Sequence, residues 1–300
     1  MLGINYLVTL LFTLAALKKI GGAAPGKTVS VPQFPPEEIG ITKEIGGPST
    51  EYTYEDFIHR PGSWDDRDLD SLAVANKKWA ERTWSEAPDY FKANELGHAP
   101  KILWIGCSDA RVPASELFGE VPGSIFVHRN IANMVVHTDC SCMSVLQYAV
   151  DVLKVKHIVV CGHYDCGGVK AAMDNLQVPS PLEDWLKNIK DTFRLHKGEI
   201  LAIPDKIGRQ HRLVELNAIE QAINIYKIAH IQKARNNSRK KEKEIMRYMQ
   251  SASKPGRLPF TEPQVHAYAF DPMTGLLKKL NMMEHIQNHL SELSKVYNVY

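Results

Sequence analysis

Two short, uninterrupted apolar runs place the tightest limits on how this chain can fold. Residues 102–105 read Ile-Leu-Trp-Ile after Pro100, and residues 158–161 read Ile-Val-Val-Cys before Gly162. Runs of this length without polar alternation are typical of strands that are buried on both faces. Residues 124–127, 265–270 and 276–280 resemble three further strands.

Helical spacing separates these strands along the chain. It starts near Leu69, where apolar residues recur at intervals of three and four, and Pro88 interrupts it. The same spacing returns over residues 142–153, 169–175 and 213–234. Strands that alternate with helices predict an α/β fold, with a mostly parallel central sheet flanked by helices. In such sheets, functional sites lie where strands end and loops begin.

The overall charge balance argues against a general affinity for polyanions. Thirty-six basic and thirty-four acidic residues leave a formal charge of +2, so we expect no nucleic acid partner. Residues 235–257 are locally basic, but Tyr248 is the single aromatic residue among them, and the stretch lacks the aromatic interleaving that stacking on bases would need. We interpret this basic insert as a solvated helix extension that runs into a loop.

The first 68 residues differ from the rest of the chain. Residues 1–17 carry no charge and are followed by Lys18-Lys19. This run is short for a membrane span and resembles the apolar region of a signal peptide, so residues 1–24 are a candidate targeting segment. An organelle transit peptide and an over-extended gene start remain open alternatives. The location is therefore secretory or organellar if the segment is functional, and otherwise cytoplasmic. Residues 25–68, rich in Gly, Pro and acidic residues, indicate a linker or arm.

A histidine and a cysteine follow the second apolar run at a spacing that suits a metal ion. Two residues separate His163 from Cys166, and Gly167-Gly168 and a predicted helix come next. An imidazole and a thiolate favour Zn²⁺ over Mg²⁺ or Ca²⁺. We expect the helix start to help keep Cys166 ionised.

The end of the first apolar run supplies the complementary residues. If residues 107–111 are extended, Cys107, Asp109 and Arg111 lie on the same side. Cys107, His163 and Cys166 together form a set of three zinc ligands, which leaves the fourth tetrahedral position open, as catalytic zinc sites do. Five cysteines are too few for a disulfide scaffold, and we expect the remaining three, Cys140, Cys142 and Cys161, to be structural thiols.

Three motifs stand out along the chain: Cys-Ser-Asp-Ala-Arg-Val-Pro at 107–113, Arg-Asn-Ile-Ala-Asn at 129–133 and Gly-His-Tyr-Asp-Cys-Gly-Gly at 162–168. Together, and in this order, they make the chain resemble the β-class carbonic anhydrases. The resemblance runs from about residue 69 to 280, within a predicted enzyme domain of residues 69–300. It implies a lyase that reversibly hydrates carbon dioxide to bicarbonate and a proton. It also implies one zinc ion per chain on Cys107, His163 and Cys166, whose bound hydroxide is oriented by the catalytic pair Asp109–Arg111.

The resemblance also bears on regulation. In one group of the family, a glutamine helps to bind substrate, but this position falls on Val121. In the other group, the aspartate can leave its arginine and close the zinc, favoured by low pH and by bicarbonate in a nearby pocket. Trp104, Gly106 and Arg129 match that pocket, whereas its aromatic hydroxyl aligns with Phe270, which has none. We therefore expect a bicarbonate-switchable site with weakened bicarbonate binding.

The resemblance further implies a homodimer or homotetramer, in which the helix around Trp79 and Trp84 would act as an N-terminal helical arm. Two alternative functions keep the same zinc ligands. One is a hydrolase of carbonyl sulfide or carbon disulfide, and the other is a non-catalytic zinc protein. A dinucleotide-dependent dehydrogenase is disfavoured, because no Gly-x-Gly-x-x-Gly turn follows a strand.

Overall fold

The computed structural model describes residues 69–121, 123–251, 262–282, 284 and 285. The chain divides into two compact units, residues 1–97 and residues 98–300. The predicted targeting segment, the predicted linker and the end of the basic insert (252–257) lie outside the described residues.

Two helices make up the described part of the first unit. Helix α3 (Leu69–Glu86) confirms the helix that was predicted from Leu69, and helix α4 (Asp89–Glu95) follows Pro88. The ring of Phe91 packs against Trp79 and Trp84, with centroids 5.6 and 5.1 Å away. Both tryptophans nevertheless remain more than two-fifths exposed.

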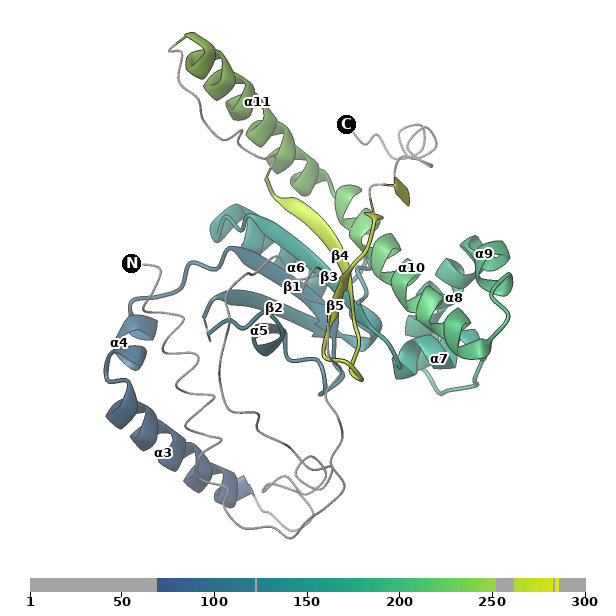
Figure 1. Ribbon diagram of the computed structural model, residues 1–300, viewed down its shortest axis with the longest axis horizontal. Helices are drawn as coiled ribbons and strands as arrows, with labels where there is room; N and C mark the ends of the chain where they lie inside the picture. Colours follow the sequence, from purple (N-terminus) through teal and green to yellow (C-terminus); the bar gives the residue numbers. More distant parts are fainter. Residues whose placement is uncertain (1–68, 122, 252–261, 283, 286–300) are drawn as a thin grey trace, which may run out of the picture. The chain divides into compact units, whose positions relative to one another are not determined.

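A five-stranded sheet forms the centre of the second unit, in the order β2-β1-β3-β4-β5 (Figure 1). The four parallel strands are β1 (Ile102–Cys107), β2 (Ile125–Asn130), β3 (His157–His163) and β4 (Gln264–Phe270). Strand β5 (Leu277–Lys279) pairs antiparallel with β4 at one edge. All five strands that the sequence predicted are present, and the mostly parallel α/β fold is confirmed.

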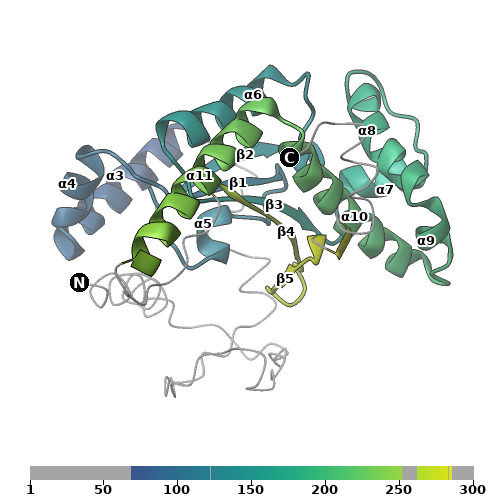
Figure 2. The same ribbon diagram turned by 90° about the horizontal axis from the view of Figure 1, so that it is seen from above.

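Helices and helical turns connect the strands and cover the sheet, with α6 and α5 on opposite sides (Figure 2). Their bounds are α5 (Ala114–Leu117), the 3₁₀ turn η2 (Ile131–Asn133), α6 (Cys140–Gln147), the π-helical turn η3 (Tyr148–Val152), α7 (Gly167–Met173), α8 (Leu182–Leu195), α9 (Lys197–Leu201), α10 (Lys206–Tyr226) and α11 (Ala229–Ser251). None of the helices in the described part of the chain combines the length and apolar character needed to cross a bilayer.

Alternating side chains of the central strands enter two separate cores. Leu103 and Ile105 join the larger core, which includes buried residues of α6, α7, α8 and α10, whereas Trp104 points to a smaller core around α5. The strands are therefore buried on both faces, which explains their continuous apolar runs. Gly162 allows α10 to approach β3 closely, because a Cβ atom there would lie 3.0 Å from Val214 Cγ1.

One helix that was predicted as continuous is broken. Residues 213–234 were expected to form a single helix, but α10 ends at Tyr226 and α11 starts at Ala229. The side-chain amide of Gln232 donates a hydrogen bond to the Tyr226 carbonyl at 2.9 Å and satisfies one acceptor that the helix end exposes. Helix α11 then continues through most of the basic insert.

Candidate metal centre

Three metal-ligating side chains converge at the carboxyl end of the sheet. Cys107 ends β1, His163 ends β3, and Cys166 immediately precedes α7. Strands β1 and β3 are parallel neighbours, so their carboxyl ends lie at the same edge. The two sulfur atoms and one imidazole nitrogen lie within 4.8 Å of one another, and all three residues are buried.

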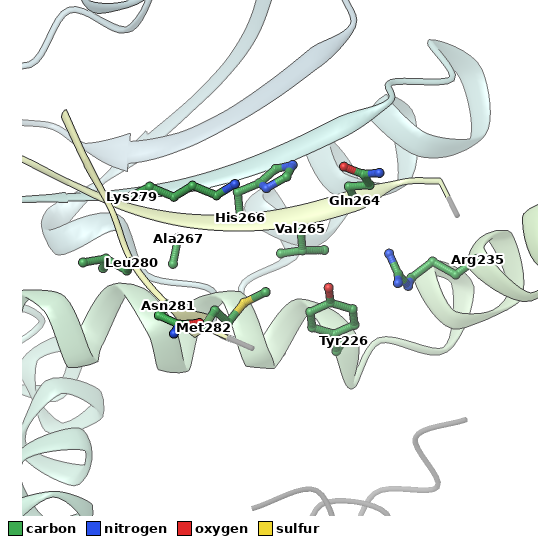
Figure 3. Close-up of a pocket in the computed structure, with 10 residues that line it drawn as sticks. All are labelled: Tyr226, Arg235, Gln264, Val265, His266, Ala267, Lys279, Leu280, Asn281 and Met282. Atoms are coloured by element: carbon green, nitrogen blue, oxygen red, sulfur yellow. The ribbon is translucent and has the colours of Figure 1, made fainter. Parts of the chain in front are cut away.

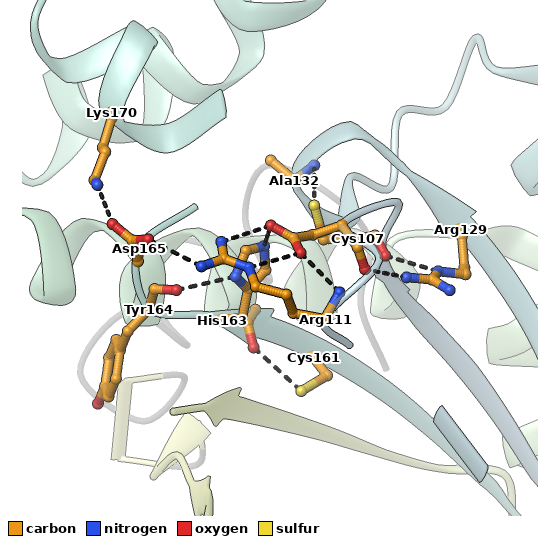
Figure 4. Close-up of polar contacts among 11 residues, drawn as sticks. Cys107, Arg111, Arg129, Ala132, Cys161, His163, Tyr164, Asp165 and Lys170 are labelled. Atoms are coloured by element: carbon orange, nitrogen blue, oxygen red, sulfur yellow. Dashed lines mark hydrogen bonds and ion pairs between the residues drawn. The ribbon is translucent and has the colours of Figure 1, made fainter. Parts of the chain in front are cut away.

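The hydrogen bond made by the His163 ring suits a metal ligand. Its Nδ1 lies 3.0 Å from the Tyr164 carbonyl oxygen (Figure 4). A carbonyl oxygen can only accept, so Nδ1 carries the proton and Nε2 presents a lone pair. Nε2 is buried and has no hydrogen-bond partner among the described residues. Two thiols and an orphaned imidazole nitrogen are the donor set that Zn²⁺ prefers, and the residues therefore fit this ion.

The side chains of Cys107 and Cys166 shift each other's pKa in opposite directions. The hydrogen bond with Cys166 lowers the pKa of Cys107 to about 4, and a contact with His163 adds to this effect. The Cys107 sulfur and burial together raise the pKa of Cys166, although the N–H groups of Gly168 and Val169 oppose them. A dication between the sulfurs would supply the missing stabilisation of the second thiolate.

A strained turn aims one more donor at the Cys107 sulfur. Ala132 and Asn133 have φ angles of 61° and 51°, in the left-handed region. The Ala132 N–H points at the Cys107 Sγ, 3.4 Å away. Asn217 and Trp185 hold the turn by donating to the carbonyls of Ala132 and Ile131, at 3.0 and 2.8 Å. Such strain persists only where the surroundings over-determine it, and it is concentrated at functional sites.

Asp109 and Arg111 form a bidentate ion pair beside the three candidate zinc ligands. Arg111 donates through Nε to Oδ1 at 3.0 Å and through Nη2 to Oδ2 at 2.8 Å. These bonds lower the pKa of the Asp109 carboxyl to about 2, so that it stays ionised at neutral pH. Asp109 Oδ2 also lies 3.8 Å from His163 Nε2, which places the carboxylate next to the predicted zinc position.

Asp109 and Arg111 are paired as the sequence predicted, but not because residues 107–111 are extended; that part of the prediction is wrong. Strand β1 ends at Cys107, and the following residues turn instead of continuing an extended alternation. The Arg111 N–H donates to Asp109 Oδ1 at 2.9 Å, and the Val112 N–H donates to the Asp109 carbonyl at 3.1 Å. An aspartate-capped turn therefore brings the two charged groups together.

Asp165 and Lys170 extend the ion pair, and sequence reasoning gave neither a role. Arg111 Nη1 donates to Asp165 Oδ2 at 3.1 Å, and Lys170 pairs with the other carboxylate oxygen (Figure 4). Asp165 has a φ of 62°, which directs the chain between the two ligands His163 and Cys166. An acidic residue inside the motif and a lysine in the first turns of the next helix were the available signals.

The residues of the predicted bicarbonate pocket lie around the same strand end. Trp104 is fully buried, and its Nε1 has no hydrogen-bond partner in the described part of the chain. A Cβ atom on Gly106 would lie 2.2 Å from that nitrogen, so only glycine fits there. Arg129 donates through Nε to the Cys107 carbonyl at 2.8 Å and through Nη2 to the Asp109 carbonyl. Phe270 belongs to the same small core as Trp104 and supplies no hydroxyl.

A cavity of about 520 Å³ lies elsewhere, among β4, the residues from β5 onward and the α10–α11 junction (Figure 3). Tyr226, Arg235, His266 and Met282 are among the residues that line it, and no predicted zinc ligand does so. Donor chemistry, and not cavity size, therefore locates the candidate metal centre.

Comparisons with known proteins agree with this chemistry. Residues 102–251 match the family model described as carbonic anhydrase. A carbonic anhydrase of Emericella nidulans is 42% identical over 230 residues, which cover 77% of this chain and 90% of the relative. The chain belongs to the β-class carbonic anhydrases.

Two solved fungal structures of the class resemble the fold. One is from Sordaria macrospora, where two tetrameric β-carbonic anhydrases are described, with 34% identity and a TM-score of 0.59. The match covers 71% of this chain and 96% of the Sordaria macrospora chain. The other is the β-carbonic anhydrase CafA of Aspergillus fumigatus, with 32% identity, a TM-score of 0.60 and coverages of 75% and 98%. The resemblance that the three motifs suggested is thereby confirmed at the level of the class.

Proposed function

We propose that Cys107, His163 and Cys166 hold one catalytic zinc ion, and that Asp109 and Arg111 complete the active site. The enzyme is a carbonic anhydrase and catalyses the reversible hydration of carbon dioxide to bicarbonate and a proton. The observation that carries the assignment of residues is the convergence of three buried ligand atoms beside an ionised carboxylate. When bound, zinc lowers the pKa of a coordinated water to about 7, a magnitude established on carbonic anhydrase itself.

The protein groups around this position orient the reaction. Asp109 accepts a hydrogen bond from the attacking oxygen and thereby fixes the direction of its remaining lone pair. Asp109 does not act as a general base at neutral pH, because Arg111 holds its pKa at about 2. Arg111 fixes the carboxylate in turn through two parallel hydrogen bonds.

Stopped-flow hydration of carbon dioxide by the full chain, with zinc quantified in the same sample, tests the proposed active site. We expect turnover that rises in proportion to the zinc content of the sample. A fully zinc-loaded protein without turnover would instead identify a non-catalytic zinc protein.

We propose further that the site is bicarbonate-switchable. The support is Trp104 Nε1, a buried donor without a partner among the residues that the structure describes, next to Gly106 and near the strand-end arginine Arg129. An acceptor such as a bicarbonate oxygen would satisfy that donor. Low pH and bicarbonate would then favour release of Asp109 from Arg111. The pKa of Asp109 lies far below neutrality. A loss of activity near neutral pH must therefore reflect protonation of another group or the release of Asp109 from Arg111.

This switch predicts inhibition by bicarbonate and a fall in kcat on acidification from about pH 8.5 to about pH 6.5. Phe270→Tyr should strengthen bicarbonate inhibition, because it adds a hydroxyl to the core that contains Trp104. Tyr268→Phe, which removes a hydroxyl from the same strand, serves as the control and should not strengthen it. Stopped-flow rates over pH and bicarbonate concentration provide the measurement. Activity that stays flat to about pH 6.5 without bicarbonate inhibition would refute the switch.

Asp165 is predicted to be a positioning residue for Arg111. Asp165→Asn should lower kcat by at most about fivefold, since a half-exposed ion pair contributes at most about 1 kcal/mol. KM and zinc content should not change. Asp184→Asn removes a comparable exposed pair, with Lys187, and should leave kcat as in the wild type. Equal losses in both variants would mean that Asp165 has no special link to catalysis.

We propose that the chain assembles as a homodimer or homotetramer. The support is the tetrameric state of the Sordaria macrospora relatives together with the exposed rings of Trp79 and Trp84 on α3. Sedimentation velocity on the full chain distinguishes these assemblies from a monomer.

A further inference from the structure

A second group of metal-ligating side chains lies away from the Cys107–His163–Cys166 cluster. His196 lies between α8 and α9, Glu220 belongs to α10, and His285 lies near the end of the described chain. Their side chains are only 8%, 14% and 14% exposed. Three segments far apart in the sequence therefore bring two imidazoles and a carboxylate together in a largely buried place.

The ligand atoms already have a spacing that suits a metal ion. Nε2 of His196 lies 2.9 Å from Glu220 Oε1, and Nε2 of His285 lies 3.2 Å from the same oxygen. All three atoms lie within 4.8 Å of one another. Zinc bonds of 2.0–2.2 Å in a tetrahedron place neighbouring ligand atoms about 3.3 Å apart. Only small shifts would convert the two hydrogen bonds into ligand contacts.

The charge of Glu220 adds to the case. Its side chain is 14% exposed, and a single carboxylate oxygen, Oε1, lies within hydrogen-bond distance of both imidazoles. A largely buried carboxylate that stays ionised requires compensating positive charge close by. Lys227 also interacts with Glu220 electrostatically. Because a lysine can also supply positive charge to this carboxylate, charge alone does not select a metal ion here. The two imidazoles must provide the selectivity for a metal.

A cavity next to Glu220 would give a metal ion and water access to the three side chains. Glu220 lines a cavity of about 480 Å³, together with His137, Asp191 and Asn224. An open route of this kind is one of the features expected of a genuine metal site. Water in the cavity could also complete the coordination, since the protein supplies three ligands.

We propose that His196, Glu220 and His285 form a second Zn²⁺ site, which fastens the residues after β5 to α10 and to the α8–α9 junction. Two imidazoles and a single carboxylate select zinc over Mg²⁺ or Ca²⁺, which prefer oxygen ligands. Binding through Nε2 requires that neither imidazole carries a proton on Nε2, and Glu220 then exchanges two hydrogen bonds for one metal bond. The ligand set contains no thiolate, which separates it chemically from the catalytic site.

Zinc stoichiometry of the full chain tests this proposal. After dialysis against excess Zn²⁺ followed by gel filtration, the wild type should retain two zinc ions per chain, measured by inductively coupled plasma mass spectrometry. Glu220→Gln and His285→Ala should each retain one and keep carbon dioxide hydration. His137→Ala removes an imidazole from the same cavity but not from the ligand set, and should retain two. Cys107→Ser should lose the other ion, so the two sites are counted separately.

Cobalt absorption provides a second readout that needs no variant at the new site. Co²⁺ added to wild type whose catalytic site already holds zinc should give only weak ligand-field bands, because His and Glu lack the thiolate charge-transfer absorption of a cysteine site. A wild type that retains a single zinc ion would overturn the proposal. So would a second ion that persists in both Glu220→Gln and His285→Ala, or cobalt bands of thiolate character.

Discussion

Cys107→Ser is expected to abolish carbon dioxide hydration and to weaken zinc binding by more than about 100-fold. Loss of a group that merely supports a ligand already costs about 10–100-fold, and here a ligand itself is removed. A serine hydroxyl is a poor substitute for a sulfur whose pKa the site lowers to about 4. Zinc per chain, competition with a chromophoric chelator and stopped-flow hydration measure the two effects.

Cys161→Ser is the matched control for this substitution. Cys161 is also a fully buried thiol near the carboxyl end of a central strand, but it points into the small core. Burial raises its pKa, and it stays a thiol. Cys161→Ser should therefore match the wild type in zinc content and in turnover, when both are expressed per amount of folded protein. Full zinc binding by Cys107→Ser would exclude Cys107 as a ligand.

Asp109→Ala should lower kcat by about 100-fold while the catalytic zinc remains bound. The change removes the group that orients the attacking oxygen, and loss of such positioning costs on the order of 100-fold. It removes none of the three side chains that converge as ligands. Arg111 would keep its contact with Asp165, which limits collapse of the loop. Steady-state kinetics with zinc quantification on the same sample provides the measurement.

The effect of Asp109→Ala should greatly exceed that of Asp165→Asn, because Asp109 is four-fifths buried beside His163, whereas Asp165 is half exposed. Asp109→Asn offers a closer comparison, since it keeps the shape but weakens both bonds to Arg111. Loss of the catalytic zinc in Asp109→Ala would show that Asp109 is a ligand, and the proposed role of the Asp109–Arg111 pair would then be wrong.

The fold was largely predictable because its signals are local. Residues 102–105 and 158–161 are apolar on both faces, as expected of strands in a parallel sheet that is covered on both sides. The break between α10 and α11 was missed because apolar spacing continues across it. Gln232 and the Tyr226 carbonyl, which cap that break, act through a geometry that the periodicity does not record. The segment 182–201, which forms α8 and α9, was likewise left without a prediction.

For the catalytic site, the sequence alone determined the donor types and the strand ends that carry Cys107, His163 and Cys166. This was possible because thiolate and imidazole side chains favour zinc over metals that prefer oxygen ligands. Only the tertiary structure decided how the aspartate meets its arginine, since the strand stops at Cys107 and a turn takes over. It alone also decided the left-handed turn at Ala132 and the meeting of His196, Glu220 and His285. Those arrangements depend on contacts between residues distant in the chain, and no local pattern encodes such contacts.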